Sequence, residues 1–324
     1  MTPGMSVLDR VAPSAVTREV KYRAAAVTYP MIYRLRARIP RYSLSEQAKV
    51  FHRRAAERGL GDVRLLYWYH TVDLGEGLVT PGTYDYRASL SNFDFPDDMD
   101  GMTVLDVGSA TGFFAFEFEK RGAHVVSVEV SSVDEVDRLP DEGVTQTIRK
   151  IGDMTAGQSA YGSAEFDIVF HQATAAEFYH YFLDGPFKLC HEALGSRVER
   201  MYSSIYDIPE TELGSRSFDL VFLGDVLLHL LHPFKALTAV APLCQGTLVL
   251  SQHMPTGSRS QPAMLYVGGD TPGYDLASWW VPNRACFEQI LRKLGFRAVK
   301  EVGRNTGSGW GGMYYDRPIL RAVR

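Results

Sequence analysis

The chain has 324 residues, 45% hydrophobic and 22% charged, which is ample for one or two domains with a large core. This composition excludes wholesale disorder, and the mild net charge of −4 selects no partner. The three cysteines (Cys190, Cys244 and Cys286) form no CxxC pair, which argues against a disulfide framework or a structural zinc site and favours a reducing cytoplasm. No apolar run approaches the roughly 18 residues that a membrane-spanning helix needs, and no signal peptide is expected.

Basic residues concentrate at the start of the chain. The first 60 residues hold 12 Lys or Arg and 4 Asp or Glu; of the 34 basic and 38 acidic residues in total, 22 and 34 remain for the rest. A basic arm on an acidic body is able to hold a phosphate-bearing partner such as tRNA. The alternative is a solvated helix face, or one that docks on the acidic body.

Residues 1–100 are predicted to form a helical N-terminal extension and a lid. Amphipathic spacing predicts a helix over residues 45–58, with Gly59 as its stop. The aromatic run Trp68-Tyr69-His70 follows, and the glycines after it favour a mobile lid, although buried packing is an alternative. The acidic, turn-rich residues 94–101 are expected to end this region.

From residue 101 onward, strand and helix patterns alternate. A strand at 103–107, a helix at 113–122 and a strand at 123–129 make a βαβ unit, which implies a parallel sheet. We therefore predict an α/β, Rossmann-like domain over 101–324 with helices on both faces. An insertion is expected at about 131–200. Further strands are predicted at 166–170 or 201–205, and at 218–223, 246–250, 298–304 and 318–323, with a helix over 287–294.

The strongest motif lies where the first of these strands turns into a helix. It reads Gly108-x-x-x-Gly112, whereas a dinucleotide site usually reads GxGxxG. Glycine lets the backbone approach a ligand, and the helix start presents free N–H groups. Glu129, at the end of the next strand, is placed to accept both hydroxyls of a ribose. The alternative is a tight turn without a ligand.

The spelling DVGSATG of residues 106–112 resembles the first motif of class I methyltransferases that use S-adenosylmethionine (SAM). Residues 217–222 (SFDLVF) are similar to the fourth-strand segment of that superfamily, and residues 204–209 to its adenine-side segment. This resemblance implies SAM as the cofactor. The residues predicted to bind it are Asp106, Gly108, Ser109, Ala110, Gly112, Glu129, Val130, Ile205, Tyr206 and Gly224.

Several longer stretches resemble the family of the tRNA wobble-uridine carboxymethyltransferase CmoB. They are residues 68–77 with 80–82, the DVGSATG turn, residues 218–233, residues 269–270 with 279–283, and residues 287–302. Together the resemblance covers roughly residues 65–324.

The sequence also departs from that family. The carboxymethyl-transferring members use a lysine ahead of the core and a tyrosine after the fourth strand to hold the cofactor's extra carboxylate. Here no lysine lies between Lys49 and Lys120, and Leu228 holds the tyrosine position, although Arg317 matches a cofactor-carboxylate arginine. A buried carboxylate without such partners is costly, so plain SAM and methyl transfer are predicted. The insertion, much longer than in CmoB, also puts tRNA as the substrate in doubt.

Methyl transfer requires a nucleophile held in line with the sulfonium methyl group and, for a hydroxyl, a base. The candidates follow strands: Asp225 and His229 follow the fourth, and His253 the fifth. His229 has packing or capping as its alternative role. No histidine and carboxylate spacing suggests a catalytic metal. The residues predicted to contact the substrate or form the lid are Trp68, Tyr69, His70, His171, Trp279 and Arg317.

Three functions are compatible with these residues. The first is methyl transfer to a hydroxyl or amine of a small molecule such as a natural product or a sugar, favoured by the acidic body and the long insertion. The second is modification of the tRNA wobble uridine by a methyl or carboxymethyl group, favoured by the resemblance and the basic first 60 residues. The third is a non-enzymatic SAM-binding module.

Overall fold

The computed structural model describes residues 45–324 except 157–159, 256–260, 269–277 and 309–313. Most of the basic arm and the family motif at residues 269–270 therefore lie outside the described residues. None of the described helices is long and apolar enough to cross a membrane.

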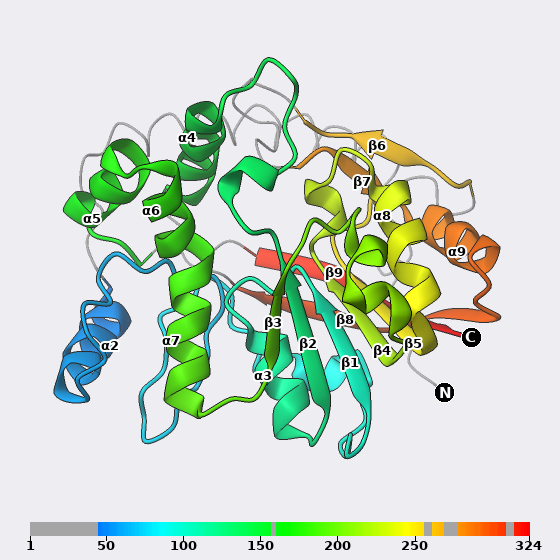
Figure 1. Ribbon diagram of the computed structural model, residues 1–324, viewed down its shortest axis with the longest axis horizontal. Coiled ribbons are helices and arrows are strands. Elements are labelled where there is room, and N and C mark those ends of the chain that lie inside the picture. Colours follow the sequence, from blue (N-terminus) through cyan, green and yellow to red (C-terminus); the bar gives the residue numbers. More distant parts are fainter. Residues whose placement is uncertain (1–44, 157–159, 256–260, 269–277, 309–313) are drawn as a thin grey trace, which may run out of the picture.

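A seven-stranded sheet lies at the centre, in the order β3-β2-β1-β4-β5-β9-β8 (Figure 1). The first five strands are parallel, and β9 runs antiparallel to both β5 and β8. The predicted Rossmann-like α/β fold is confirmed. The strands are β1 (Thr103–Val107), β2 (His124–Glu129), β3 (Glu199–Tyr202), β4 (Phe218–Gly224), β5 (Cys244–Ser251), β8 (Ala298–Ser308) and β9 (Tyr314–Val323), with a separate pair β6 (Met264–Tyr266) and β7 (Trp280–Pro282).

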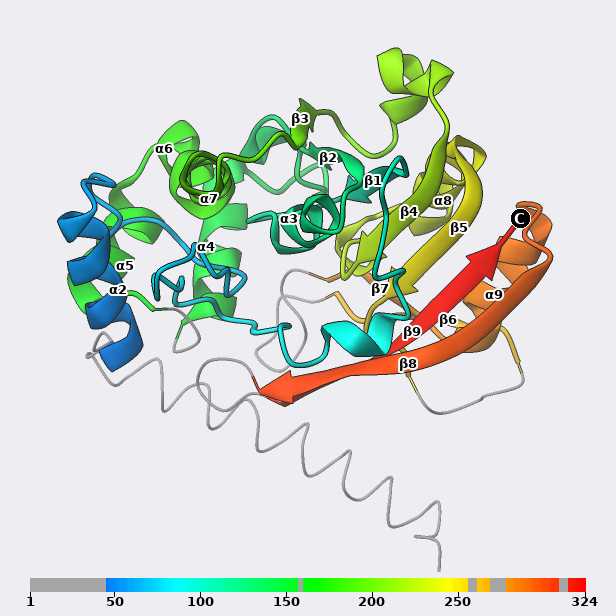
Figure 2. The same cartoon turned by 90° about the horizontal axis from the view of Figure 1, so that it is seen from below.

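Helices cover both faces of the sheet because side chains alternate along each strand. On one face, Val104 and Phe222 pack with the phenylalanines of α3 (Phe113–Lys120) and with α7 (Gly185–Leu194). On the other face, Leu105 and Val221 pack with α8 (Pro233–Val240) and α9 (Arg284–Lys293). Figure 2 shows α3 and α7 on one side of the strands and α9 on the other.

The N-terminal segment begins with the predicted helix, α2 (Glu46–Glu57), which Ser45 caps by accepting a hydrogen bond from Ala48 N at 3.0 Å. The rest of the segment, for which the lid was predicted, is mostly non-helical. Among the described residues 60–100, the helical element is one 3₁₀ turn, Leu90–Phe93, since the glycines and prolines of this stretch favour loops. Phe93 and Phe95 pack on Phe222, so this segment shares the core of the sheet.

The insertion is helical. It contains α4 (Val144–Thr155), α5 (Ser163–Asp167) and α6 (Ala175–Tyr179), with π-helical turns at Ile168–Gln172 and His180–Asp184 before α7. These helices group near α2, away from α8 and α9 (Figures 1 and 2). The alternative strand at 166–170 is wrong, because Phe166 and Phe170 belong to an aromatic cluster between helices. The other predicted strand, at 201–205, overlaps the observed β3, which lies at Glu199–Tyr202.

Candidate active site

Left-handed residues build the turn after β1. Gly108, Ala110 and Gly112 have φ values of +72°, +48° and +87°. A Cβ atom on Gly108 would lie 2.6 Å from Val226 Cγ2, so only glycine fits there. Ala110 adopts this conformation despite its side chain, and such strain concentrates at functional sites. The turn has the tight geometry that the sequence predicts.

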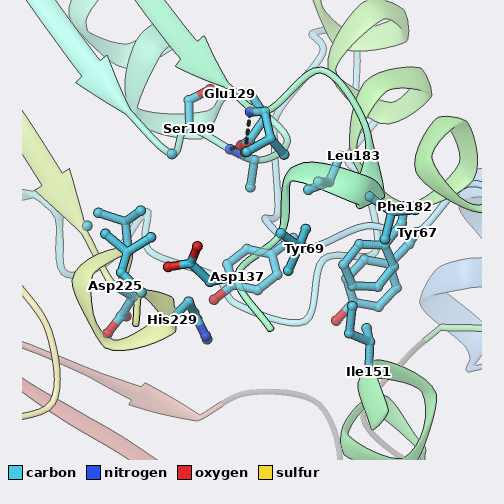
Figure 3. A pocket seen from close by; sticks show the side chains of 18 of the residues that line it. Tyr67, Tyr69, Ser109, Glu129, Asp137, Ile151, Phe182, Leu183, Asp225 and His229 are labelled. Carbon is cyan, nitrogen blue, oxygen red and sulfur yellow. Dashed lines mark hydrogen bonds between the residues drawn. The ribbon is translucent and has the colours of Figure 1, made fainter. Parts of the chain in front are cut away.

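Glu129 links the end of β2 to this turn by hydrogen bonds. Its carboxylate accepts hydrogen bonds from Ala110 N at 3.0 Å and from Val130 N at 3.1 Å (Figure 3). A carboxylate has about four acceptor positions, so capacity for ribose hydroxyls remains. The turn and the end of β2 thus form one unit.

Arg200 holds the turn after β1 in place, and sequence reasoning missed it. From β3, its Nη1 donates to Ser109 Oγ and, at 2.8 Å, to Ser127 Oγ, and its guanidinium lies 4.1 Å from the centre of the Phe187 ring. Nothing in the spacing indicates this contact, because it depends on the pairing of β3 with β2.

Asp106 is buried beneath the turn, with 2% of its surface exposed. Burial raises the pKa of its carboxyl to about 7; Arg200 opposes this shift and Glu129 adds to it. Its Oδ2 has no hydrogen-bond partner among the described residues.

A cavity of about 270 Å³ extends from the turn to the insertion. Ten residues were predicted to bind the cofactor, and three of them do not line this cavity. Gly112 lies against Phe116 and Phe187, Ile205 is buried in the core, and Tyr206 donates its hydroxyl to Asp137. The predicted residues that line the cavity are Asp106, Gly108, Ser109, Ala110, Glu129, Val130 and Gly224.

Asp137, from the start of the insertion, is a second missed residue. Its Oδ2 accepts hydrogen bonds from Tyr206 Oη and, at 2.6 Å, from Leu231 N. It lines the cavity, and Figure 3 shows it between Tyr69 and the side occupied by Asp225 and His229. Asp137 therefore joins the insertion to the segment that follows β4.

Asp225 follows β4 in a left-handed conformation, φ +49°, and lines the cavity. It forms an ion pair with Arg317, and the two side chains are only 10% and 12% exposed. Arg317 lies over the rings of Tyr84 and Tyr315, at 5.2 and 4.9 Å from their centres. The charge of Arg317 is thus matched within the protein, and this residue does not line the cavity.

The structure separates His171, His229 and His253, three of the four predicted histidines. His229 lines the cavity, whereas His253 and His171 are exposed and do not. Ser251, the last residue of β5, lines the cavity; Gln252 after it is buried, and His253 emerges at the surface. His171 lies on the outer side of a π-helical turn. The structure therefore does not place His253, the predicted base, or His171, the predicted substrate contact, at this cavity.

The predicted lid is a fixed wall. Tyr69 and His70 line the cavity, but Trp68 is 2% exposed and packs its ring 5.0 Å from that of Phe51. Thr83 N donates to Trp68 O at 2.7 Å, and Tyr84 N donates to Tyr69 O at 2.9 Å. These bonds, with extensive burial, favour the alternative of buried packing over a mobile lid.

This wall is joined directly to the turn after β1, residues 108–112, which we call the cofactor turn. His70 N donates to Thr111 Oγ1 at 3.1 Å. Burial lowers the pKa of His70 to about 3, and the charge of Arg317 adds to this effect, so its imidazole is neutral. Trp279, which is distant from this wall in the sequence, also lines the cavity, and its backbone N–H donates to Leu228 O at 2.8 Å.

Several buried polar atoms around the cavity have no hydrogen-bond partner within the described part of the chain. Such atoms are rare in folded proteins, and their gathering at one cavity indicates a polar ligand. In the same described ranges, no three His, Cys, Asp or Glu side chains gather as metal ligands would. The unpartnered atoms that border the cavity are His70 Nδ1, Asp106 Oδ2, Asp225 Oδ1 and Ser251 Oγ.

A family of methyltransferase domains matches residues 83–301, which span the sheet from before β1 into β8. The chain belongs to this family. A curated relative, the magnesium-protoporphyrin O-methyltransferase of Rhodobacter capsulatus, is 37% identical over 84 residues. That match covers 24% of this chain and 38% of the relative, so the chain spans about two-fifths of the relative's length.

Solved structures with a similar fold have low identity. The N-terminal domain of EvdMO1, crystallised with S-adenosylhomocysteine (SAH) and D-fucose, is 15% identical with a TM-score of 0.41 over 86% of this chain and 97% of that one. The magnesium protoporphyrin IX methyltransferase of Synechocystis, with bound SAM, is 15% identical with a TM-score of 0.38 over 97% and 100%. An O-methyltransferase family protein of Burkholderia thailandensis is 14% identical with a TM-score of 0.42 over 98% and 74%.

With the family assigned, the chain is a SAM-dependent methyltransferase of class I, and the prediction of SAM as its cofactor is confirmed. The glycine turn, the carboxylate at the end of β2 and the unpartnered polar atoms fit this cofactor.

Proposed function

We propose that this methyltransferase transfers a methyl group from SAM to a hydroxyl or amine of a small molecule. The observation that supports this proposal is a continuous cavity, which begins at the cofactor turn and continues into the insertion. The curated relative, by its name, methylates oxygen, which favours oxygen over nitrogen as the acceptor atom.

SAM supplies an electrophilic methyl group when it is bound. On this proposal, the turn at residues 108–110 and the carboxylate of Asp106 hold its methionine end, and Glu129 accepts its ribose hydroxyls. Val130 and Gly224 border the remaining part of the same space.

Asp225 and His229 are the proposed acceptor-side residues. Asp225 Oδ1 is buried without a partner while Oδ2 is engaged by Arg317, so Oδ1 is available to accept a hydrogen bond from the acceptor hydroxyl. His229 lines the same cavity and is the proposed base for the hydroxyl proton. Holding the acceptor oxygen in one orientation is the main contribution expected of this site.

The charges around the cavity favour a small molecule over a nucleic acid. Among the described residues, the lining includes two basic side chains besides histidine, and both are engaged: Arg138 donates to Asp134 O at 2.7 Å, and Lys150 is paired with Glu142. Nucleic acids are held chiefly by basic groups on their phosphates. The lining carries six acidic residues, namely Asp106, Glu129, Glu135, Asp137, Glu142 and Asp225.

Modification of tRNA is the alternative, based on the resemblance to the CmoB family and on the basic first 60 residues. The carboxymethyl version is the less favoured form, because Asp225 already neutralises the one matching arginine, Arg317. We also propose that the chain divides into an N-terminal extension, residues 1–100, and a SAM-binding methyltransferase domain, residues 101–324.

The test combines cofactor binding with an acceptor screen. Calorimetric titration with SAH should show saturable binding that Glu129→Ala weakens about tenfold and Glu129→Gln weakens less, since the amide retains one acceptor oxygen. SAM labelled in its methyl group is then incubated with hydroxylated small molecules and, separately, with bulk tRNA. Label in the organic extract supports the proposal; label in precipitated RNA that is lost as salt rises supports the alternative. A chain that does not bind SAH would overturn both.

A further inference from the structure

Beyond the cofactor turn, the cavity opens into a space that the methyl-transfer chemistry does not use. We call it the aromatic chamber. It is bordered by Tyr67 from the N-terminal wall, by α4, and by the helical segment before α7. Figure 3 shows Tyr67, Phe182 and Ile151 together on the side of Tyr69 away from Asp225. The chamber residues are Tyr67, Ile151, Met154, Phe178, Phe182 and Leu183.

The chamber presents rings and alkyl groups. Tyr67 stacks on Phe182, with ring centres 4.4 Å apart and an interplanar angle of 8°. The Tyr67 hydroxyl pairs with Thr83 Oγ1 at 3.0 Å, so this residue offers the cavity its ring. Ligand cavities typically combine such apolar walls with a few placed polar groups.

Four of these side chains are only half-buried, although they lie between packed elements. Ile151, Met154, Phe182 and Leu183 each keep partial exposure while bordering the cavity. Apolar surface left open at this place gains free energy when an apolar ligand covers it.

A charged pair beside the chamber is already matched within the protein. Lys150 pairs with Glu142, and their side chains are 18% and 9% exposed. A ligand with its own charge would be desolvated there without an unmatched counter-charge, which is costly. The chamber therefore favours an uncharged ligand.

We propose that the aromatic chamber binds the uncharged, ring-bearing apolar body of the methyl acceptor, while the acceptor hydroxyl reaches Asp225 and His229. The insertion, and not the sheet, then selects the acceptor. This inference rests on the proposed function, and it favours an apolar ring system over a free sugar, whose hydroxyls the chamber would leave without partners.

The test uses a neutral fluorophore, N-phenyl-1-naphthylamine, with the full-length chain saturated with SAH. Wild type should bind the probe saturably, and SAH should not displace it. Ile151→Asp, which places a charge in the chamber, should weaken probe binding at least about tenfold while SAH affinity stays unchanged. Gln146→Asp, which adds the same charge at an exposed position of α4, should leave both affinities unchanged.

Other outcomes are equally decisive. Should Ile151→Asp lose SAH binding through misfolding, Met154→Gln, which keeps the side-chain length, replaces it and should weaken the probe alone. SAH binding without saturable probe binding, displacement of the probe by SAH, or equal effects of Ile151→Asp and Gln146→Asp would overturn the chamber proposal. Absence of SAH binding in wild type would instead overturn the proposed function.

Discussion

The cofactor side and the acceptor side of the cavity are built by different means. Around the turn after β1, the backbone itself is constrained, with three left-handed residues within five positions and Glu129 holding Ala110 N. Around the chamber, rings pack between helices, as in the stacked pair Tyr67 and Phe182. On the cofactor side, backbone dihedral angles and hydrogen bonds hold the atoms in place. On the acceptor side, the volumes of packed side chains do so. The cofactor side should therefore tolerate little change, while the acceptor side is open to change of specificity.

The largest effect is expected where the two sides meet, at the buried pair of Arg317 and Asp225. Arg317→Leu leaves the Asp225 carboxylate buried and unpaired, so unfolding free energy should fall by about 3–5 kcal/mol. Unfolding in denaturant measures this loss of free energy. The double variant Asp225→Asn/Arg317→Leu should recover more than half of the loss, because it removes the stranded charge.

The matched control lies on neighbouring strands. Arg304 pairs with Asp316 at 2.7 Å but is 40% exposed, so Arg304→Leu should cost less than about 1 kcal/mol. Equal losses in Arg317→Leu and Arg304→Leu would show that burial of the first pair has no energetic consequence.

The next effect tests the claim that backbone geometry defines the cofactor side. Gly108→Ala adds a methyl group 2.6 Å from Val226 Cγ2 and forces a positive φ on alanine, so SAH affinity should fall about a hundredfold. Gly143→Ala is the control, since a Cβ there meets nothing within 4 Å and its φ is −83°. Calorimetric titration compares the two, and an unchanged affinity in Gly108→Ala would contradict the role of the turn.

The smallest effect concerns the protonation of Asp106. Its pKa is about 7 in the folded chain and about 4 when unfolded, so the folded state holds the extra proton. The bound proton therefore contributes to the free energy of unfolding at low pH. This contribution is lost as the pH rises through 7, by about 1 kcal/mol between pH 6 and 8. Unfolding at both pH values should show this loss in wild type and not in Asp106→Asn. Identical pH dependence in both proteins would refute the assignment.

The sequence by itself determined the parts that depend on neighbours along the chain. The βαβ unit, the Gly108 to Gly112 turn and Glu129 at the end of β2 are local patterns, because strand period, glycine conformation and helix start each depend on a few adjacent residues. The identity of the cofactor followed from the resemblance of these residues to the first motif of class I methyltransferases.

Tertiary structure decided everything that required distant segments to meet. Arg200 reaches Ser109 only because β3 pairs with β2, and Asp137 reaches Leu231 only because the insertion folds back over the site. His253 carried the same local signal as His229, yet the end of β5 places it at the surface. Side-chain direction at the end of a strand and contacts across the sheet depend on packing, which no local pattern in a single sequence contains.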